Sequence, residues 1–241
     1  MKININPAVD PRERIIVALD VPTAIDAIEL CDRLPQVSFW KVGLELFIAD
    51  GATILRELKS RNKRIFLDLK LHDIPNTVGS ACRVATKYGA DFLTIHAAGG
   101  KAMMRAAQTE VQGSSTQLLA ISLLTSISSQ ELASDLKVNL DLPEYTAQMV
   151  LMAQSCGLTG AVCSPHEAAA LKARLNSQSD LDFCLVTPGV RPQGSEIGDQ
   201  SRVMTPQQAI EAGADYLVIG RPITAAVDPV AAWDQICQEC G

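Results

Sequence analysis

Short apolar runs alternate along the chain with longer segments in which apolar residues recur every three or four positions. Apolar runs of about four to eight residues are typical of strands buried on both faces, as in a parallel sheet. Eight runs are predicted to be strands: residues 15–20, 39–43, 65–70, 92–96, 118–125, 160–163, 183–187 and 216–220. The amphipathic segments between them are predicted to be helices: residues 23–33, 49–61, 78–88, 102–112, 143–155, 165–174 and 206–212.

The ends of several predicted helices carry residues that favour starting or stopping a helix. Pro165 follows Ser164 and Pro206 follows Thr205, the order expected for an N-cap and the first helical position. Glycine closes helices at positions 89, 157 and 213, each just before a predicted strand.

Regular alternation of strand and helix predicts a parallel sheet covered by helices. Eight repeats in 241 residues fit an α/β fold of the closed (β/α)₈ or TIM-barrel type. An open, doubly wound sheet is the alternative, but the first predicted strand is not followed by the Gly-x-Gly-x-x-Gly turn of dinucleotide-binding sheets. We find no linker or break in composition, so residues 1–241 are expected to form one domain.

Composition narrows the classes of partner. The net charge is -6 and the pI about 5.1, so neither a nucleic acid nor a membrane surface is expected as a partner. Residues 1–14 lack the apolar core of a signal peptide and no apolar run could span a bilayer, which predicts a cytoplasmic protein.

Seven scattered cysteines suit reduced thiols, and the single Cys237/Cys240 pair lacks the further ligands of a zinc site.

The most informative polar residues are Asp68, Lys70 and Asp73. Asp68 and Lys70 are two apart and would project from one face of a strand, and residues 74–76 must turn the chain directly after Asp73. An exposed, solvated ion pair is the ordinary explanation of such a pattern. Here the flanking residues 65–67 are apolar, as expected for a buried strand, so we predict a functional site at the end of this strand.

Other predicted strands also end in polar residues, and in a barrel these ends meet at one face. They are Asp20, Lys41, His96, Thr125, Ser126, Thr187, Gly220 and Arg221. Two lysines interleaved with three aspartates allow each carboxylate to pair without a metal ion.

The last two strand ends indicate a phosphate site. Residues 187–192 read Thr-Pro-Gly-Val-Arg-Pro, a Gly-rich segment 194–200 follows, and Gly220-Arg221 ends the last strand. Glycines let backbone N–H groups approach an anion, and an arginine can bind it through two parallel hydrogen bonds. The alternative is that Arg191 and Arg221 are surface residues beside tight turns.

These motifs resemble orotidine 5'-phosphate decarboxylases of the compact bacterial type. The resemblance is carried by Asp-Leu-Lys-Leu-His-Asp-Ile-Pro-Asn-Thr at 68–77, by residues 187–192, and by Val-Ile-Gly-Arg-Pro at 218–222. Asp20, Lys41 and Thr125 also fall where that family has them. The resemblance extends over about residues 15–228.

The resemblance implies a lyase that converts orotidine 5'-phosphate to UMP in de novo pyrimidine biosynthesis, with no cofactor and no metal. Loss of CO₂ leaves a carbanion at pyrimidine C6, which has to be stabilised electrostatically. Lys70 would stabilise this charge and then protonate C6, and Asp68 and Asp73 would favour the charged form of Lys70. Asp68 would also lie near the substrate carboxylate.

The resemblance also implies a set of substrate contacts. Lys41 would orient Asp68 and a ribose hydroxyl, and Asp20 would hold the ribose. The remaining contacts would be Thr125 and Ser126 to the pyrimidine, and Arg191, Gln200, Gly220 and Arg221 to the phosphate and the loop that closes over it. Asp73 and Thr77 are expected to enter the neighbouring subunit's site, which makes the enzyme a homodimer.

Two other functions remain open. One is a metal-dependent sugar-phosphate decarboxylase or aldolase of the same superfamily, although such relatives carry an acidic metal ligand where this chain has Lys41. The other is a non-catalytic nucleotide-binding barrel, which would not need Lys70 and its aspartates. A barrel with only a generic phosphate site would not explain them either.

Among the histidines, His72 is expected to pack outside the site, His96 could line the pocket and His166 is expected at the surface.

Overall fold

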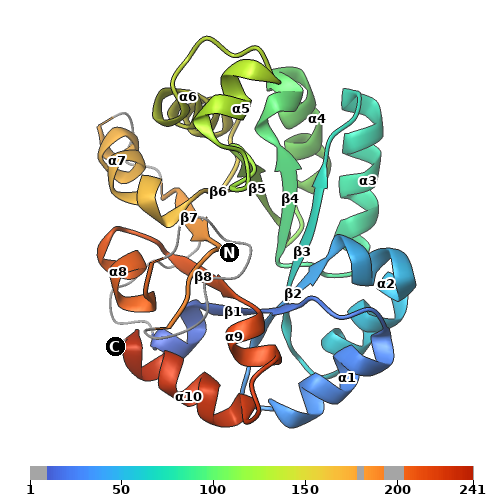
Figure 1. The fold of residues 1–241 in the computed structure, drawn as a ribbon. Coiled ribbons are helices and arrows are strands. Elements are labelled where there is room, and N and C mark those ends of the chain that lie inside the picture. Colours follow the sequence, from blue (N-terminus) through green and yellow to red (C-terminus); the bar gives the residue numbers. More distant parts are fainter. Residues whose placement is uncertain (1–9, 178–181, 193–203, 241) are drawn as a thin grey trace.

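The computed structural model describes residues 10–177, 182–192 and 204–240, and within them eight parallel strands close into a barrel (Figure 1). Each strand pairs with the next along the chain, and the last pairs with the first. The strands are β1 (Ile15–Leu19), β2 (Phe39–Gly43), β3 (Arg64–Leu71), β4 (Phe92–His96), β5 (Gln117–Ile121), β6 (Gly160–Val162), β7 (Cys184–Thr187) and β8 (Tyr216–Ile219). The predicted (β/α)₈ barrel is confirmed, and the open-sheet alternative is wrong.

Helices surround the barrel, as Figure 1 shows. The α-helices are α1 (Ala24–Arg33), α2 (Leu44–Ser60), α3 (Pro75–Lys87), α4 (Gly100–Val111), α5 (Ser129–Ser134), α6 (Leu142–Ser155), α7 (Pro165–Asn176), α8 (Pro206–Glu211), α9 (Arg221–Thr224) and α10 (Pro229–Glu239). Two short 3₁₀ helices, η1 (Pro11–Arg14) and η2 (Ala97–Gly99), precede β1 and α4.

The structure differs from the predicted elements in three places. β5 ends at Ile121 rather than at residue 125, because the apolar run continues into the loop before α5. α2 begins at Leu44, and Asp50 lies outside helical geometry (φ -163°, ψ 58°), so periodicity detected only the part after this kink. α5, α9 and α10 were not predicted, although α10 has the expected start: the Asp228 carboxylate accepts the backbone N–H groups of Val230 and Ala231, just after Pro229.

Side chains alternate between two apolar layers. On β4, Phe92 points into the barrel, whereas Leu93 and Ile95 pack against the helices. The floor of the barrel is filled by aromatic rings, and the Arg64 guanidinium lies 4.0 Å from the Phe39 ring centroid. The N-terminal half of the barrel is therefore packed solid, and space for a ligand remains at the C-terminal ends of the strands.

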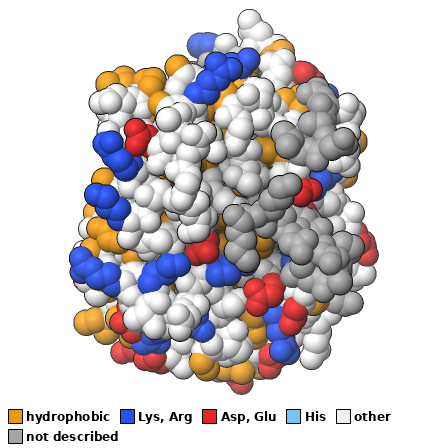
Figure 2. All heavy atoms as spheres, turned by 180° about the vertical axis from the view of Figure 1, so that it is seen from behind, with side chains coloured by type: hydrophobic (Ala, Val, Ile, Leu, Met, Phe, Trp, Pro, Cys, Tyr) orange, Lys and Arg blue, Asp and Glu red, His pale blue; other side chains and the backbone are white. Residues whose placement is uncertain are grey.

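The outer surface carries both signs of charge. On the face seen in Figure 2, Lys and Arg side chains are interspersed with Asp and Glu. Within the described part of the chain, no helix has the length and apolar character required to cross a membrane.

Candidate active site

A pocket of about 300 Å³ opens at the C-terminal ends of the strands, where the sequence predicted the site. Its walls combine charged residues from β2 and β3 with apolar residues from the opposite strands. The lining residues are Lys41, Phe66, Asp68, Lys70, Ile121, Leu123, Leu124, Thr125, Ser126, Val162, Pro188 and Val218. One wall is thus charged and the other apolar, which suits a flat ring with polar substituents.

Four side chains of alternating charge form a chain that includes this charged wall and extends beyond it to Asp20. Lys41 Nζ lies 2.7 Å from Asp20 Oδ1 and 4.0 Å from Asp68 Oδ2. Lys70 Nζ lies 2.7 Å from the same Asp68 oxygen. The side chains of Lys41 and Asp68 are only 11% and 12% exposed, so water screens their interaction poorly. Each carboxylate is paired with an ammonium group, as the sequence predicted for these two aspartates.

The backbone of β3 is irregular where it carries this site. Leu67 pairs with Leu93 and Leu71 pairs with Ile95, so three residues of β3 oppose one residue of β4. Lys70, within this bulge, has a left-handed conformation with φ 51°. Such a conformation costs a non-glycine residue on the order of 1–3 kcal/mol and is found preferentially at functional sites.

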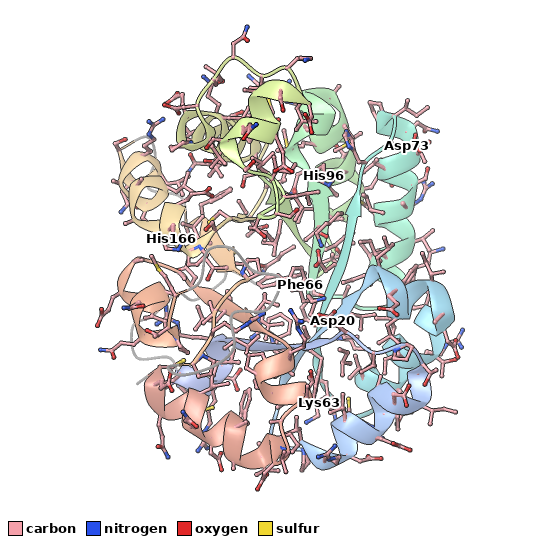
Figure 3. All side chains as sticks on the ribbon, in the orientation of Figure 1. Asp20, Lys63, Phe66, Asp73, His96 and His166 are labelled. Carbon is pink, nitrogen blue, oxygen red and sulfur yellow. The ribbon has the colours of Figure 1, made fainter. Side chains whose placement is uncertain are left out.

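Asp73 lies apart from the other charges. Its side chain is not among the pocket-lining residues, and its Oδ1 accepts the N–H of Ile74, the residue before α3. In Figure 3, Asp73 lies at the edge of the molecule near α3, whereas Asp20 and Phe66 lie towards the middle of the ring of strands. Thr77 is exposed in the first turn of α3. The expected cluster of three charges is therefore formed within one chain only by Asp68 and Lys70.

The predicted phosphate residues lie after β7 and β8. Arg191 follows β7, and Arg221 begins α9 directly after Gly220. Burial lowers the pKa of Arg191, and the charge of Arg221 lowers it further, so the two guanidinium groups are electrostatically coupled. Two cations that repel one another favour an anion between them. Gln200 and the remainder of segment 194–200 lie outside the described residues.

Two of the three histidines lie against one another beside the pocket. The ring centroids of His72 and His96 are 5.2 Å apart. Burial lowers the pKa of His96, and the charges of His72 and Lys70 lower it further. Neither residue lines the pocket, so the expectation that His96 could do so is not met. His166 is exposed at the start of α7 and lies away from the site in Figure 3.

Cys237 lies on α10 and Cys240 directly follows it, and the two are not disulfide-bonded. Burial raises the pKa of Cys237 to about 11 and that of Cys240 to about 12, which keeps both as unreactive thiols at neutral pH. Over residues 10–177, 182–192 and 204–240, no three His, Cys, Asp or Glu side chains are grouped so that they could hold a metal ion.

Comparison with known proteins identifies the family. The profile of the orotidine 5'-phosphate decarboxylase / HUMPS family matches residues 13–236. The chain belongs to this family. An orotidine 5'-phosphate decarboxylase of Gloeothece citriformis is 62% identical over 94% of this chain and 97% of its own length. The orotidine 5'-phosphate decarboxylase of Nostoc sp. is 57% identical over 94% of this chain and 97% of its own length.

A solved structure of the same family agrees with the fold. The crystal structure of orotidine 5'-phosphate decarboxylase from Lactobacillus acidophilus superposes with a TM-score of 0.82 at 36% identity, covering 94% of this chain and 98% of that one. The barrel and the strand order are therefore those of the family.

Sequence reasoning missed two residues that shape the site, Thr94 and Gly43. Thr94 is fully buried and contacts both Asp68 and Lys70. The sequence did carry a signal for Thr94, because it is a polar residue in the middle of an apolar strand. Gly43 adjoins the Lys41 ammonium, and the sequence gives no sign of this beyond the glycine itself.

Proposed function

We propose that the chain decarboxylates orotidine 5'-phosphate to UMP, in pyrimidine biosynthesis in the cytoplasm, with Lys70 as the catalytic cation. The observation that carries the proposal is the Asp20–Lys41–Asp68–Lys70 charge chain, of which the last three residues line the barrel pocket. Membership of the family, and relatives of that name at up to 62% identity, support the same reaction.

In this reaction the bond between C6 and the carboxylate carbon breaks, and its electron pair stays on C6. That orbital lies in the ring plane, so the π-system cannot delocalise the charge. The Lys70 ammonium, held 2.7 Å from Asp68, would stabilise the developing carbanion and donate its proton to C6 as CO₂ leaves. No external electron acceptor is required.

The neighbouring charges would hold Lys70 and the ribose in place. Lys41 bridges Asp20 and Asp68, so it fixes the carboxylate beside Lys70 and leaves Asp20, whose side chain is 54% exposed, open to ribose hydroxyls. Such fixed charges need little rearrangement during the reaction. Thr125 and Ser126, on the opposite side of the pocket, offer hydroxyls to the pyrimidine.

The phosphate would bind between Arg191 and Arg221, the coupled pair after β7 and β8. Gly220 lies next to the carboxylate proposed to hold the ribose, since a Cβ there would be in van der Waals contact with Asp20 Oδ2 at 3.5 Å. Gln200 is expected to join them. Phosphate binding far from C6 can supply free energy for the chemical step.

A homodimer with shared sites accounts for the position of Asp73. Asp73 and Thr77 are exposed and point to no partner within their own pocket. Ile74, next to Asp73, is 66% exposed, and the first two turns of α2, directly after β2, carry two more exposed apolar side chains, Leu44 (56%) and Ile48 (74%). A second copy packed on this surface would bury them and bring Asp73 and Thr77 to its own pocket.

The metal-dependent alternative is disfavoured by the donor set. Asp68 lines the pocket and Asp20 adjoins it through Lys41, and the ammonium groups of Lys41 and Lys70 already pair with these two carboxylates. A divalent cation would have to displace both lysines, against their charge.

The test is the ultraviolet absorbance of orotidine 5'-phosphate incubated with purified protein in excess EDTA, with Lys70→Ala as the inactive control. We expect the orotate band to fall, UMP to form, and the control to show no turnover while still binding UMP. No reaction in EDTA, together with activity on a sugar phosphate once Mg²⁺ is restored, would refute the proposal. So would near-normal turnover by Lys70→Ala.

A further inference from the structure

Thr94 joins the two catalytic groups of β3 through one hydroxyl. Its side chain points into the barrel from β4 and is fully buried. The Oγ1 atom accepts the backbone N–H of Lys70 at 2.8 Å and donates to Asp68 Oδ1 at 2.9 Å. The other oxygen of Asp68, Oδ2, is the one that contacts Lys70 Nζ. Thr94 therefore holds the carboxylate from one side while the ammonium holds it from the other.

The direction of these hydrogen bonds is fixed by chemistry. A backbone N–H can only donate and an ionised carboxylate can only accept, so the single hydroxyl proton of Thr94 must lie towards Asp68. If the hydroxyl turned to another partner, the Asp68 carboxylate or the Lys70 N–H would lose its hydrogen bond away from water. Both contacts depend on the oxygen atom and neither depends on the methyl group.

The same hydroxyl supports an unfavourable backbone conformation. Because three residues of β3 oppose Thr94 alone, the N–H of Lys70 bonds to the hydroxyl of Thr94 rather than to a backbone carbonyl of β4. Lys70 has φ 51°, which a lysine adopts only when its surroundings impose it. The hydrogen bond that the Lys70 N–H donates to Thr94 Oγ1 stabilises this conformation directly.

We propose that Thr94 is a positioning residue of the decarboxylation: its hydroxyl holds the Lys70 backbone in the left-handed conformation and fixes the Asp68 carboxylate against the Lys70 ammonium. The inference rests on the proposed function of Lys70. Thr94 is not itself a catalytic residue, because it does not line the pocket. Removing the hydroxyl should therefore impair turnover more than substrate binding.

The experiment compares Thr94→Val, which keeps the shape but lacks the hydroxyl, with Thr94→Ser, which keeps the hydroxyl but lacks the methyl group. We expect Thr94→Val to lower kcat by about tenfold or more, with KM and UMP affinity little changed, because small displacements of catalytic groups have effects of this size. Thr94→Ser should recover most of the lost kcat.

Thr116→Val is the matched control. Thr116 is also buried, and its hydroxyl donates to the Ala90 carbonyl at 2.7 Å just before β5, at the opposite end of the barrel. We expect it to lower thermal stability about as much as Thr94→Val while leaving kcat unchanged. Wild-type kcat in Thr94→Val, or equal losses of kcat in the Val and Ser variants, would overturn the proposal.

A crystal structure of Thr94→Val separates this inference from the proposed reaction. We expect Lys70 to leave the left-handed conformation, or its Nζ to move away from Asp68, whichever reaction the protein catalyses. An unchanged Lys70 and Asp68 would refute the positioning role. Absence of decarboxylase activity in the wild type, with a displaced Lys70 in the variant, would refute only the proposed reaction.

Discussion

Gly43 leaves the space that the Lys41 ammonium occupies. A Cβ at Gly43 would lie 2.9 Å from Lys41 Nζ and 3.2 Å from Asp20 Oδ1. The two residues are two apart on β2 and face the same side, so the side chain of Lys41 extends over the Cα of Gly43 to reach Asp20. Gly43 has φ -86° and ψ 179°, which any residue can adopt, so glycine is needed here for space and not for its backbone freedom.

Gly43→Ala is therefore expected to displace the Lys41 ammonium without unfolding the barrel. Since Lys41 bridges Asp20 and Asp68, kcat/KM for orotidine 5'-phosphate should fall by about 10- to 100-fold. Steady-state kinetics measure this, and a thermal melt reports stability. Gly79→Ala is the control, because its Cβ would meet Glu110 at a similarly short 3.3 Å between α3 and α4. Equal losses of kcat/KM in both variants would show that the effect is not specific to Lys41.

Mixing inactive subunits tests whether Asp73 acts across a dimer. Lys70→Ala and Asp73→Ala should each be inactive, but a hybrid dimer regains one intact site. Random exchange of equal amounts should restore about a quarter of the wild-type sites, because half of the dimers are hybrids with one good site each.

The control mixture pairs Lys70→Ala with Asp68→Ala. These two residues contact one another within one chain, so no hybrid site is complete and no activity should return. Subunit exchange is monitored with two different affinity tags. Exchange without recovery in the Lys70→Ala and Asp73→Ala mixture would contradict the shared site.

Arg221→Ala should mainly weaken substrate binding. Loss of a charge-assisted contact to phosphate is expected to raise KM by about 10- to 100-fold, with a smaller effect on kcat. Arg105→Ala, at an exposed position on α4, provides the control for loss of a surface charge. Initial rates over a range of substrate concentrations separate the two constants. A large fall in kcat at unchanged KM would contradict a simple phosphate contact.

His96 should make the fold less stable in acid. Burial, His72 and Lys70 lower the pKa of His96 below the ordinary value of 6.5, and Asp68 opposes this only in part. The unfolded chain then binds a proton more readily than the folded one, so this contribution to stability is lost as pH falls below 6.5 towards the folded pKa.

His96→Gln removes this titration. The fall in Tm between pH 8 and pH 5 should be smaller in the variant than in the wild type, as measured by differential scanning calorimetry. His166→Gln, at an exposed position, should leave the pH dependence unchanged. An identical pH dependence of Tm in His96→Gln and the wild type would show that burial of His96 has no energetic consequence.

Much of the site could be predicted from the sequence because it depends on local patterns. The period of two placed Asp68 and Lys70 on one face of their strand, and the end of each strand could be located within a few residues. The predicted strand 118–125 extends past Ile121, where β5 ends, and this shows the limit of the reasoning. An apolar loop residue such as Leu124 cannot be told from a strand residue by pattern alone.

Local patterns were enough to predict the eight-fold alternation, the family and the charged residues at the strand ends, because solvent exposure and backbone sterics act over a few neighbouring residues. Which of those charges meet depends on how the strands pair in the fold. Lys41 reaches Asp20 and Asp68 because β1 and β3 pair on either side of β2. The N–H of Lys70, in the β3 bulge, donates to the Thr94 hydroxyl of β4, a contact between strands that no local pattern records.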